Sequence, residues 1–447
     1  MAKRHVLFPV LCGVLLFAGC SGGSDSSSSA IPARSDLAVL GDEIFHDANL
    51  SAAGNQACST CHVKAAGLAN NNGAAVMFGG PALDKPGLRN TPSLTYTSFT
   101  PVFSMTDDGP VGGFFRDGRA ATLTDQAQKP FTNEFEMANA DAAAVIAKLI
   151  TRPYLADFTA IFGAAVLDDP ETALVRVGAA LAAYQTEDKD FGAFDSKFDA
   201  WRAGKAQLTA QEVRGFALYN SPSRGNCAAC HPATSADGKT PALFTDFSYD
   251  NLGVPRNTTL EANNDSTTLS YIVALQRADY DGVHKYYDLG VCGPLRSDIA
   301  NNYADAGVCG AFKVPTLRNI ALTAPYFHNG RFNDLRTALS FYVTRDTDPG
   351  KWYPKAGNIV TKFDDLPEIY GGQFKVDLSN PAGNPKYAGN VNVTEVPYNR
   401  KLGDAPALAP DEIDDVIAFL CTLNDGYDPS NPSGYIKPQQ CLDVQKP

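Results

Sequence analysis

The pattern C-x-x-C-H occurs twice in the sequence, and its residue types and spacing suit one kind of chemistry. Two such thiols form thioethers with the vinyl groups of a haem, and the adjacent histidine binds the iron from one side. A zinc site or a redox dithiol uses similar residues, but a zinc site needs four ligands and each motif offers three. The motif residues are Cys58, Cys61 and His62 in "CSTCH", and Cys227, Cys230 and His231 in "CAACH". We therefore expect two covalently bound haem c groups, with the two motif histidines as proximal ligands.

The side chains that remain for the opposite face of each iron decide what each haem can do. An electron-carrying haem usually takes a second histidine or a methionine there. Apart from the motif histidines, the sequence has His5, His46, His284 and His328, and its methionines are Met1, Met77, Met105 and Met137. The second haem therefore has no methionine in its own half of the chain. No histidine lies between the two motifs, so we expect an open position on the first iron, although His46 and His284 remain as possible ligands from elsewhere.

The segments before the two motifs resemble each other, which indicates a degenerate repeat. Residues 37–62 and 208–231 each combine an amphipathic helical pattern with a turn of small residues and then C-x-x-C-H. Further helical patterns cover residues 141–152, 170–185 and 410–423.

Strand signals in the sequence are few and short, and three long segments are rich in Gly, Pro and Asn. These segments, 70–115, 232–310 and 345–405, are typical of loops packed round cofactors. We expect a mainly α fold with two cytochrome-c-like domains packed face to face. The N-terminal haem domain would span 37–200 and the C-terminal haem domain 201–447.

The N-terminus has the pattern of an export signal. Lys3 and Arg4 precede an apolar run over 6–18, which is too short for a typical spanning helix and ends in "LFAGC". We expect residues 1–19 to be a signal peptide of the lipoprotein type, Cys20 to carry a lipid, and 20–36 to be a flexible tether. A plain cleaved signal is the alternative. The protein would then be exported, periplasmic or at the cell surface, and held on the outer membrane only through the lipid on Cys20.

Composition and charge limit the class of protein. Hydrophobic residues make up 44% and charged residues 19% of the 447 residues, as in soluble globular proteins. The formal net charge is −12, and no basic stripe interrupts it. These values argue against a nucleic-acid partner.

Four cysteines of the exported chain are not explained by the motifs or the lipid anchor. Spare cysteines in an exported chain suggest disulfides. The simplest pairing is Cys292 with Cys309 and Cys421 with Cys441, but the sequence alone does not fix it.

Three further stretches resemble the bacterial dihaem cytochrome c peroxidase/MauG family. They are "RNTPSL" (89–94), "FFRDGRAATLTDQAQKPFTNEFEM" (114–137) and "KVPTLRNIALTAPYFHNGRFNDLRTALSFY" (313–342), and with both motifs they spread over most of the chain. In the peroxidase branch, a methionine stands eight residues after the start of the last helix. Here Tyr342 holds that position, as a tyrosine does in the MauG branch, so the resemblance implies Tyr342 as the distal ligand of the second haem. The alternatives are a packing role for Tyr342 and ligation by His328.

A phenolate ligand has a clear chemical consequence. It is a hard anion that favours high iron valences, whereas a thioether favours the reduced state. A Tyr-ligated haem would therefore store an oxidising equivalent better than a reducing electron.

The resemblance also assigns residues around the first haem and between the haems. Glu136 would be the distal acid and base, and Gln126 would orient peroxide; for each, a solvated helix residue is the ordinary alternative. Asn90, with the carbonyls of Thr323 and Pro325, would hold a calcium ion.

Two positions bear on electron transfer. The family usually has a tryptophan where this sequence has Arg116, and the segment before it is about ten residues longer than the common pattern, so a neighbouring aromatic ring is a candidate substitute. Trp201 is a candidate surface relay, or simply a capping aromatic.

These features together predict a haem-dependent enzyme that uses H2O2. The first haem would activate H2O2, and the oxidising equivalents would reach a Trp or Tyr of a partner protein; the lipoprotein signal resembles MbnH-like and surface-associated members. The runner-up is a cytochrome c peroxidase that takes electrons from a small cytochrome or cupredoxin. A passive electron carrier is a third possibility.

Overall fold

The computed structural model describes residues 33–444 except 71, 236, 264–285 and 297–306. The expected signal peptide, Cys20, most of the tether and His284 lie outside the described residues. Within the described part of the chain, we find no helix that combines the length and the apolar character needed to cross a bilayer.

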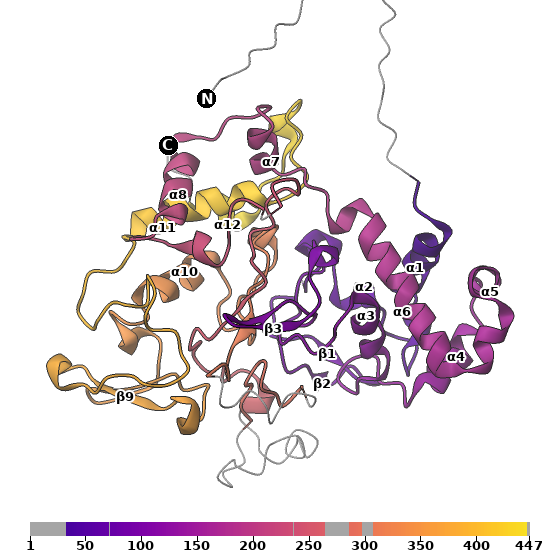
Figure 1. Cartoon of the computed structure of the whole chain (residues 1–447), viewed down its shortest axis with the longest axis horizontal. Coiled ribbons are helices and arrows are strands. Elements are labelled where there is room, and N and C mark those ends of the chain that lie inside the picture. The colour runs from indigo at the N-terminus through magenta and orange to yellow at the C-terminus, as the bar shows by residue number, and fades with distance from the viewer. Residues whose placement is uncertain (1–32, 71, 236, 264–285, 297–306, 445–447) are drawn as a thin grey trace, which may run out of the picture. The chain divides into compact units, whose positions relative to one another are not determined.

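Helices provide most of the regular structure (Figure 1). The α-helices are α1 (Asp36–His46), α2 (Cys58–Cys61), α3 (Leu123–Thr132), α4 (Ala142–Leu149), α5 (Leu155–Phe162), α6 (Pro170–Glu187), α7 (Lys197–Arg202), α8 (Ala210–Asn220), α10 (Leu335–Thr344), α11 (Pro410–Leu420) and α12 (Gln439–Leu442). The helices predicted from periodicity are confirmed as α1, α4, α6, α8 and α11. Polar N-caps fix several of their starts, as where Thr209 and Glu212 form a capping box on α8.

The strands are short and pair only locally. They are β1 (Phe78–Gly79), β2 (Lys85–Pro86), β3 (Ser104–Thr106), β4 (Gly109–Val111), β5 (Tyr249–Asp250), β6 (Phe312–Lys313), β7 (Lys355–Ala356), β8 (Ile359–Lys362) and β9 (Phe374–Asp377). Each of β1–β2, β3–β4 and β5–β6 is an antiparallel pair, and β7–β8–β9 form an antiparallel sheet. That sheet lies in a segment expected to be loop, because strands of two to four residues are too short for their alternation to stand out among Gly and Asn.

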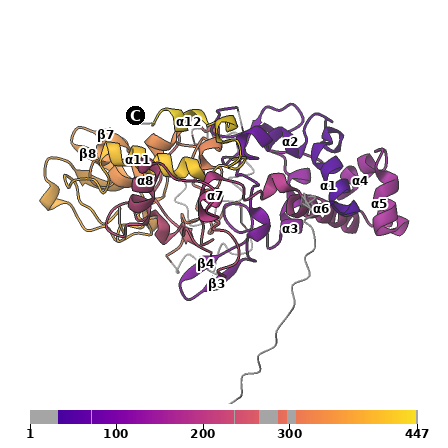
Figure 2. The ribbon, with the colours of Figure 1, turned by 90° about the horizontal axis from the view of Figure 1, so that it is seen from above.

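The two repeats build equivalent helix pairs. The opening helix α1 packs on α6, and the opening helix α8 packs on α11, as both views show (Figures 1 and 2). Each opening helix has a glycine at the crossing. A Cβ at Gly41 would lie 2.0 Å from the carbonyl oxygen of Ala180, and one at Gly215 would lie 1.8 Å from that of Asp415. Glycine therefore allows the backbones of both pairs to touch.

Two hydrophobic clusters accompany these pairs. One is built from residues between Leu40 and Phe191, and the other from residues between Phe198 and Val444. The first surrounds the α1–α6 pair and the second the α8–α11 pair. Each haem motif thus follows a helix that is anchored in its own core.

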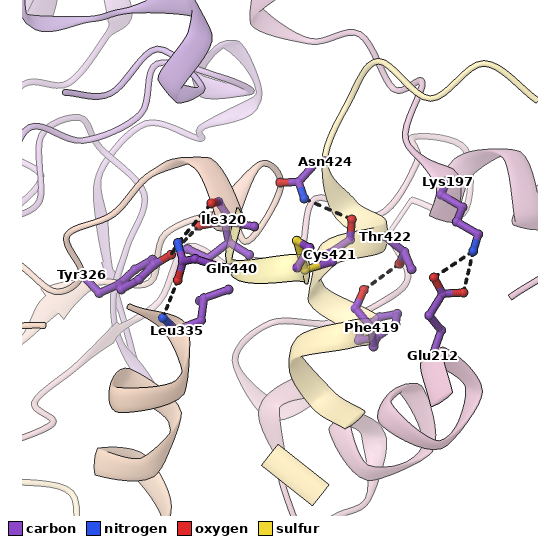
Figure 3. The surroundings of a disulfide bond; sticks show 12 residues. Lys197, Glu212, Ile320, Tyr326, Leu335, Phe419, Cys421, Thr422, Asn424 and Gln440 are labelled. Atoms are coloured by element: carbon purple, nitrogen blue, oxygen red, sulfur yellow. Dashed lines mark hydrogen bonds and ion pairs between the residues drawn. A yellow bond between two sulfur atoms is a disulfide. The ribbon is translucent and has the colours of Figure 1, made fainter. Parts of the chain in front are cut away.

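A disulfide and a glutamine fix the start of α10. Cys421, just after α11, is bonded to Cys441 on α12, and the neighbouring Gln440 accepts a hydrogen bond from the backbone N–H of Leu335 at 2.7 Å (Figure 3). Gln440 also donates to the hydroxyl of Tyr326 at 2.9 Å. The helix that carries Tyr342 is therefore tied at its first residue to the end of the chain.

The other disulfide joins Cys292 and Cys309. Both simplest pairings from the sequence are therefore confirmed, and none of the four motif cysteines is in a disulfide.

We expect Gly215→Ala to destabilise the haem-loaded protein. Alanine inside a helix is normally favoured over glycine by about 1 kcal/mol, but here the added Cβ would overlap the backbone of α11, and overpacking costs about 1–3 kcal/mol. Thermal unfolding followed by circular dichroism should show a lower Tm. Val213→Ala, on the exposed face of α8, is the control and should leave the Tm almost unchanged. An equal or higher Tm for Gly215→Ala would contradict the close helix contact.

Candidate active site

The first motif presents one ring nitrogen of its histidine to a cavity. The Nδ1 atom of His62 lies 2.9 Å from the carbonyl oxygen of Leu68. A carbonyl only accepts, so Nδ1 carries the hydrogen and Nε2 keeps its lone pair. Burial lowers the pKa of His62 to about 4. The imidazole is therefore neutral and oriented, as a metal ligand requires.

The second motif repeats this geometry. The Nδ1 atom of His231 lies 2.8 Å from the carbonyl oxygen of Phe244, and burial lowers the pKa of His231. Leu68 and Phe244 both have left-handed backbones, with φ of 55° and 53°. That conformation is uncommon for bulky residues and is found where function imposes a backbone direction. Here it turns a carbonyl toward the histidine ring.

One continuous cavity of about 550 Å³ connects the two motifs. Its lining includes most of the predicted site residues: Cys61, His62, Asn90, Gln126, Glu136, Cys227, Cys230, His231, Thr323, Pro325 and Tyr342. Burial raises the pKa of Cys61 to about 11 and of Cys230 to about 12, so these thiols are protonated before attachment. Free thiols beside an oriented histidine and a large cavity fit a covalently bound haem at each motif.

Glu136 lines the cavity on the side of the first motif. Its Oε2 accepts a hydrogen bond from Nδ2 of Asn133 at 2.8 Å. Burial raises the pKa of Glu136, although Arg119 and this hydrogen bond act in the opposite direction. Gln126, on α3, lines the same cavity. The structure therefore brings the two predicted catalytic residues to one chamber.

Two adjacent glycines, Gly79 and Gly80, hold Glu136 in position, and the sequence alone did not point to them. The N–H of Gly80 donates to the carbonyl of Glu136 at 2.8 Å. A Cβ at Gly79 would lie 2.1 Å from the carbonyl oxygen of Phe135, so only glycine permits this approach. The signal in the sequence was "FGG" at residues 78–80, which spans β1 and the first residue of the β1–β2 turn.

Tyr342 lines the cavity near the second motif. It is on α10, and its ring lies 5.6 Å from that of Phe327 and 6.0 Å from that of Tyr398. Burial raises the pKa of Tyr342, and the charge of Asp250 raises it further. The phenol is thus protonated in the protein alone, and a bound ferric ion would be needed to displace its proton.

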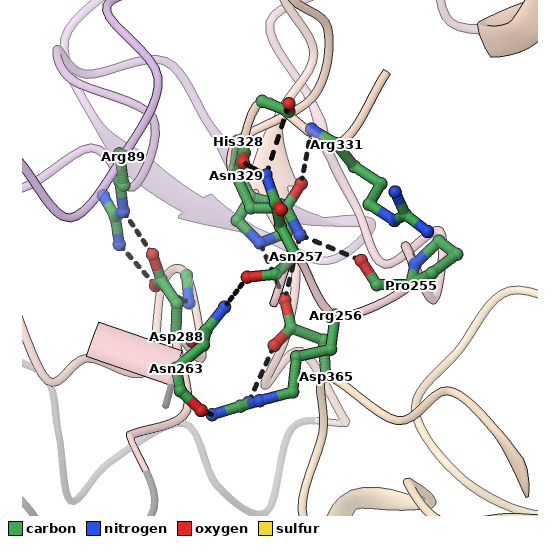
Figure 4. Close-up of polar contacts among 12 residues, drawn as sticks. Arg89, Pro255, Arg256, Asn257, Asn263, Asp288, His328, Asn329, Arg331 and Asp365 are labelled. Atoms are coloured by element: carbon green, nitrogen blue, oxygen red, sulfur yellow. Dashed lines mark hydrogen bonds and ion pairs between the residues drawn. The ribbon is translucent and has the colours of Figure 1, made fainter. Parts of the chain in front are cut away.

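The surroundings of the other candidate iron ligands differ from those of Tyr342. His328 also lines the cavity; it is buried, its ring stacks on that of Phe312 with centroids 3.8 Å apart, and its Nε2 lies 3.5 Å from Asp365 (Figure 4). His46 is exposed on α1, where its Nδ1 contacts Asp42. Among the methionines in the described residues, Met77 lines the cavity, whereas Met137 is buried in the N-terminal core.

Comparison with known proteins places these features in a family. The family model for di-haem cytochrome c peroxidase matches residues 35–207. The chain is 35% identical to the methylamine utilization protein MauG of Paracoccus denitrificans over 408 residues, which cover 90% of this chain and 91% of that protein. It belongs to the di-haem cytochrome c peroxidase/MauG family. The protein is therefore a haem-dependent oxidoreductase that acts with peroxide, and it carries two haem c groups.

Two further relatives support this assignment within the di-haem family. The diheme peroxidase BthA of Burkholderia thailandensis has 34% sequence identity and a TM-score of 0.73, with 92% of each chain covered. The cytochrome c peroxidase Ccp of Escherichia coli is 30% identical over 70% of this chain, which corresponds to 54% of that protein. A MauG-like protein associated with microbial copper homeostasis, at 22% identity and a TM-score of 0.55, shares the fold.

At the position where the family resemblance predicts a calcium ion, the side chain of Arg116 contacts Asn90. Asn90, Thr323 and Pro325 all line the cavity. However, the side-chain Oδ1 of Asn90 accepts a hydrogen bond from Arg116 at 2.8 Å, and the backbone carbonyl of Asn90 accepts another at 3.1 Å. As it stands, Asn90 does not fit as a calcium ligand, because the cationic side chain of Arg116 already bonds both of its oxygens.

The structure also shows the surroundings of Arg116 and Trp201, the two positions that bear on electron transfer. The longer segment before Arg116 forms the β3–β4 hairpin, and the hydroxyl of Tyr249 donates to the carbonyl of Gly112 just after it. Trp201 is half-buried on α7, with its ring 5.6 Å from Phe198 and 5.5 Å from Phe216. It is absent from the cavity lining and packs on the C-terminal core.

Proposed function

We propose that the protein is an H2O2-dependent dihaem oxidase that oxidises a Trp or Tyr side chain of a partner protein. Each H2O2 takes two electrons and two protons to give two waters, and the partner's aromatic group supplies the electrons. The haem irons supply the redox chemistry of this reaction. The N-terminal haem domain, residues 37–200, would receive peroxide, and the C-terminal haem domain, 201–447, would hold the second oxidising equivalent.

The observation that carries this proposal is the presence of Tyr342 in the cavity beside the second motif. Among the described residues, the methionines lie outside the C-terminal half, and His328 is stacked on Phe312. Tyr342 is therefore the side chain best placed to serve as the second distal ligand. A phenolate there would stabilise an oxidised rather than a reduced second haem.

The first pocket has the groups needed to move protons on peroxide. We assign Glu136 to take the proton of the bound oxygen and return it to the leaving oxygen, and Gln126 to orient peroxide. Asn133 and Gly80 hold Glu136 in place by the hydrogen bonds described above.

We propose that electrons from the partner protein enter at the surface of the C-terminal half. Trp201 is a candidate relay because it is half-buried and connects through Phe198 to that core. We further propose that the protein is exported and attached to the outer membrane through Cys20.

A cytochrome c peroxidase is the second candidate function. The likeness to BthA, named a diheme peroxidase, over 92% of the chain favours it. In this case a small cytochrome or cupredoxin would supply the electrons, and the enzyme would serve to remove H2O2.

Addition of H2O2 to the ferric protein without reductant should separate the two functions. We expect a long-lived, two-electron-oxidised protein with near-infrared absorbance, because the phenolate stabilises high valence. Rapid turnover that requires prior one-electron reduction, with reduced cytochrome c as donor, would instead support the peroxidase.

We expect Glu136→Gln to slow the reaction with H2O2 by roughly 10²–10⁴-fold, the usual contribution of general acid–base catalysis. The wild-type rate should fall as the pH drops through the pKa of Glu136, since the carboxylate is the base. Burial raises that pKa, so the acid limb should lie above the value of about 4.3 for an exposed glutamate. Stopped-flow spectra across pH measure both effects. Glu134→Gln, at a half-buried carboxylate paired with Lys85, should leave rate and profile unchanged; an acid limb that survives in Glu136→Gln would reject the assignment.

Tyr342→Met should raise the midpoint potential of one haem by on the order of 100 mV, within the ~0.8 V range that axial ligands span. The thioether favours the reduced iron, whereas the phenolate favours the oxidised iron. Spectroelectrochemistry of the variant and of Tyr398→Phe tests this. If Tyr398→Phe, and not Tyr342→Met, shifts the potential, the ligand assignment is wrong.

A further inference from the structure

Arg116 bonds Asn90 through two donors, and every polar group of Asn90 has a partner. The Nε and Nη2 atoms of Arg116 donate to the backbone carbonyl and to Oδ1 of Asn90. The N–H of Asn90 donates to the carbonyl of His328 at 2.8 Å, and Nδ2 donates to the carbonyl of Ala75 at 3.3 Å. The amide is therefore fixed with Oδ1 toward the guanidinium.

A buried lysine, Lys313, lies next to Arg116, and burial lowers the pKa of this lysine to about 7. The N–H of Lys313 donates to the carbonyl of Arg116 at 2.8 Å, and the ammonium of Lys313 donates to the carbonyl of Gly113. Both side chains line the shared cavity. A divalent cation at the Asn90 oxygens would meet the guanidinium of Arg116, which already bonds both of those oxygens.

The nearby carboxylates are already engaged. Asp288 accepts from Nε of Arg89 at 2.6 Å and from Nη2 of Arg89 at 2.7 Å (Figure 4), and Asp117 is paired with Arg89 and Arg119 at 2.8 Å. Calcium takes six to eight oxygen ligands, usually with carboxylates among them. Here the carboxylates bind arginines, and Asn90 binds Arg116.

We propose that the guanidinium of Arg116 takes the place of a calcium ion at Asn90. The positive charge at this position is then part of the protein and does not exchange with the solvent. The protein neither binds calcium there nor needs calcium to hold the loop of Asn90 and His328. Arg116 is a positioning residue in this account: it orients Asn90, and Asn90 holds the backbone of His328. The same substitution explains why an arginine stands where a neutral tryptophan is expected.

Calcium binding by the haem-loaded protein tests the proposal. The wild-type protein is equilibrated with CaCl2 and passed through a desalting column. Elemental analysis should then find almost no calcium per chain. EGTA should change neither its Tm nor its visible spectrum. One calcium per chain, or a Tm lowered by EGTA, would overturn the proposal.

Arg116→Gln tests whether the arginine fills an ion site. This variant removes the charge and frees the oxygens of Asn90, so it should retain about one calcium and acquire a Tm that EGTA lowers. Arg116→Lys keeps the charge and should stay free of calcium. Arg331→Gln removes an exposed charge from the loop after His328 and should behave as wild type. If a folded Arg116→Gln binds no calcium, the guanidinium does not replace an ion.

Discussion

Each motif histidine donates its Nδ1 hydrogen to a backbone carbonyl, and the rest of the site depends on this bond. The bond fixes the tautomer and leaves a lone pair on Nε2 of His62 and of His231, both of which line the cavity. The acceptors, Leu68 and Phe244, hold left-handed backbones that cost energy, so the surrounding fold must enforce them. The helix pairs α1–α6 and α8–α11, in contact at Gly41 and Gly215, form the rigid base from which both motifs extend.

The attachment geometry is the same at both motifs, but the cavity around each differs. Near the first motif, the cavity is lined by a carboxyl and an amide, Glu136 and Gln126. Near the second, it is lined by the phenols of Tyr342 and Tyr398 together with the carboxyls of Asp250 and Glu395. One sequence repeat therefore supports two different chemical environments. The difference comes from segments outside the repeat: α3 and the turn at Gly79 for the first, and α10 for the second.

The sequence predicted the parts of the molecule that rest on short-range patterns. The motifs and the helices with clear periodicity follow from spacing and residue type. The sequence left the disulfide pairing open, and the structure shows the simplest one. The sheet β7–β9 was missed because its strands are too short to show alternation. Contacts between distant segments were also missed, since Gly80 with Glu136, Gln440 with Leu335, and Arg116 with Asn90 depend on tertiary packing. Only the family resemblance directed attention to Glu136 and Tyr342, whose residue types are common in ordinary helices.

The central claim is an asymmetry between an open first iron and a phenolate-bound second iron. A crystal structure of the ferric, haem-loaded protein tests it most directly. We predict that the hydroxyl oxygen of Tyr342 is bonded to the second iron opposite His231 and that no side chain is bonded to the first iron opposite His62. A bond from Met77 or any histidine to the first iron, or a Tyr342 oxygen beyond bonding distance of the second, would contradict the account.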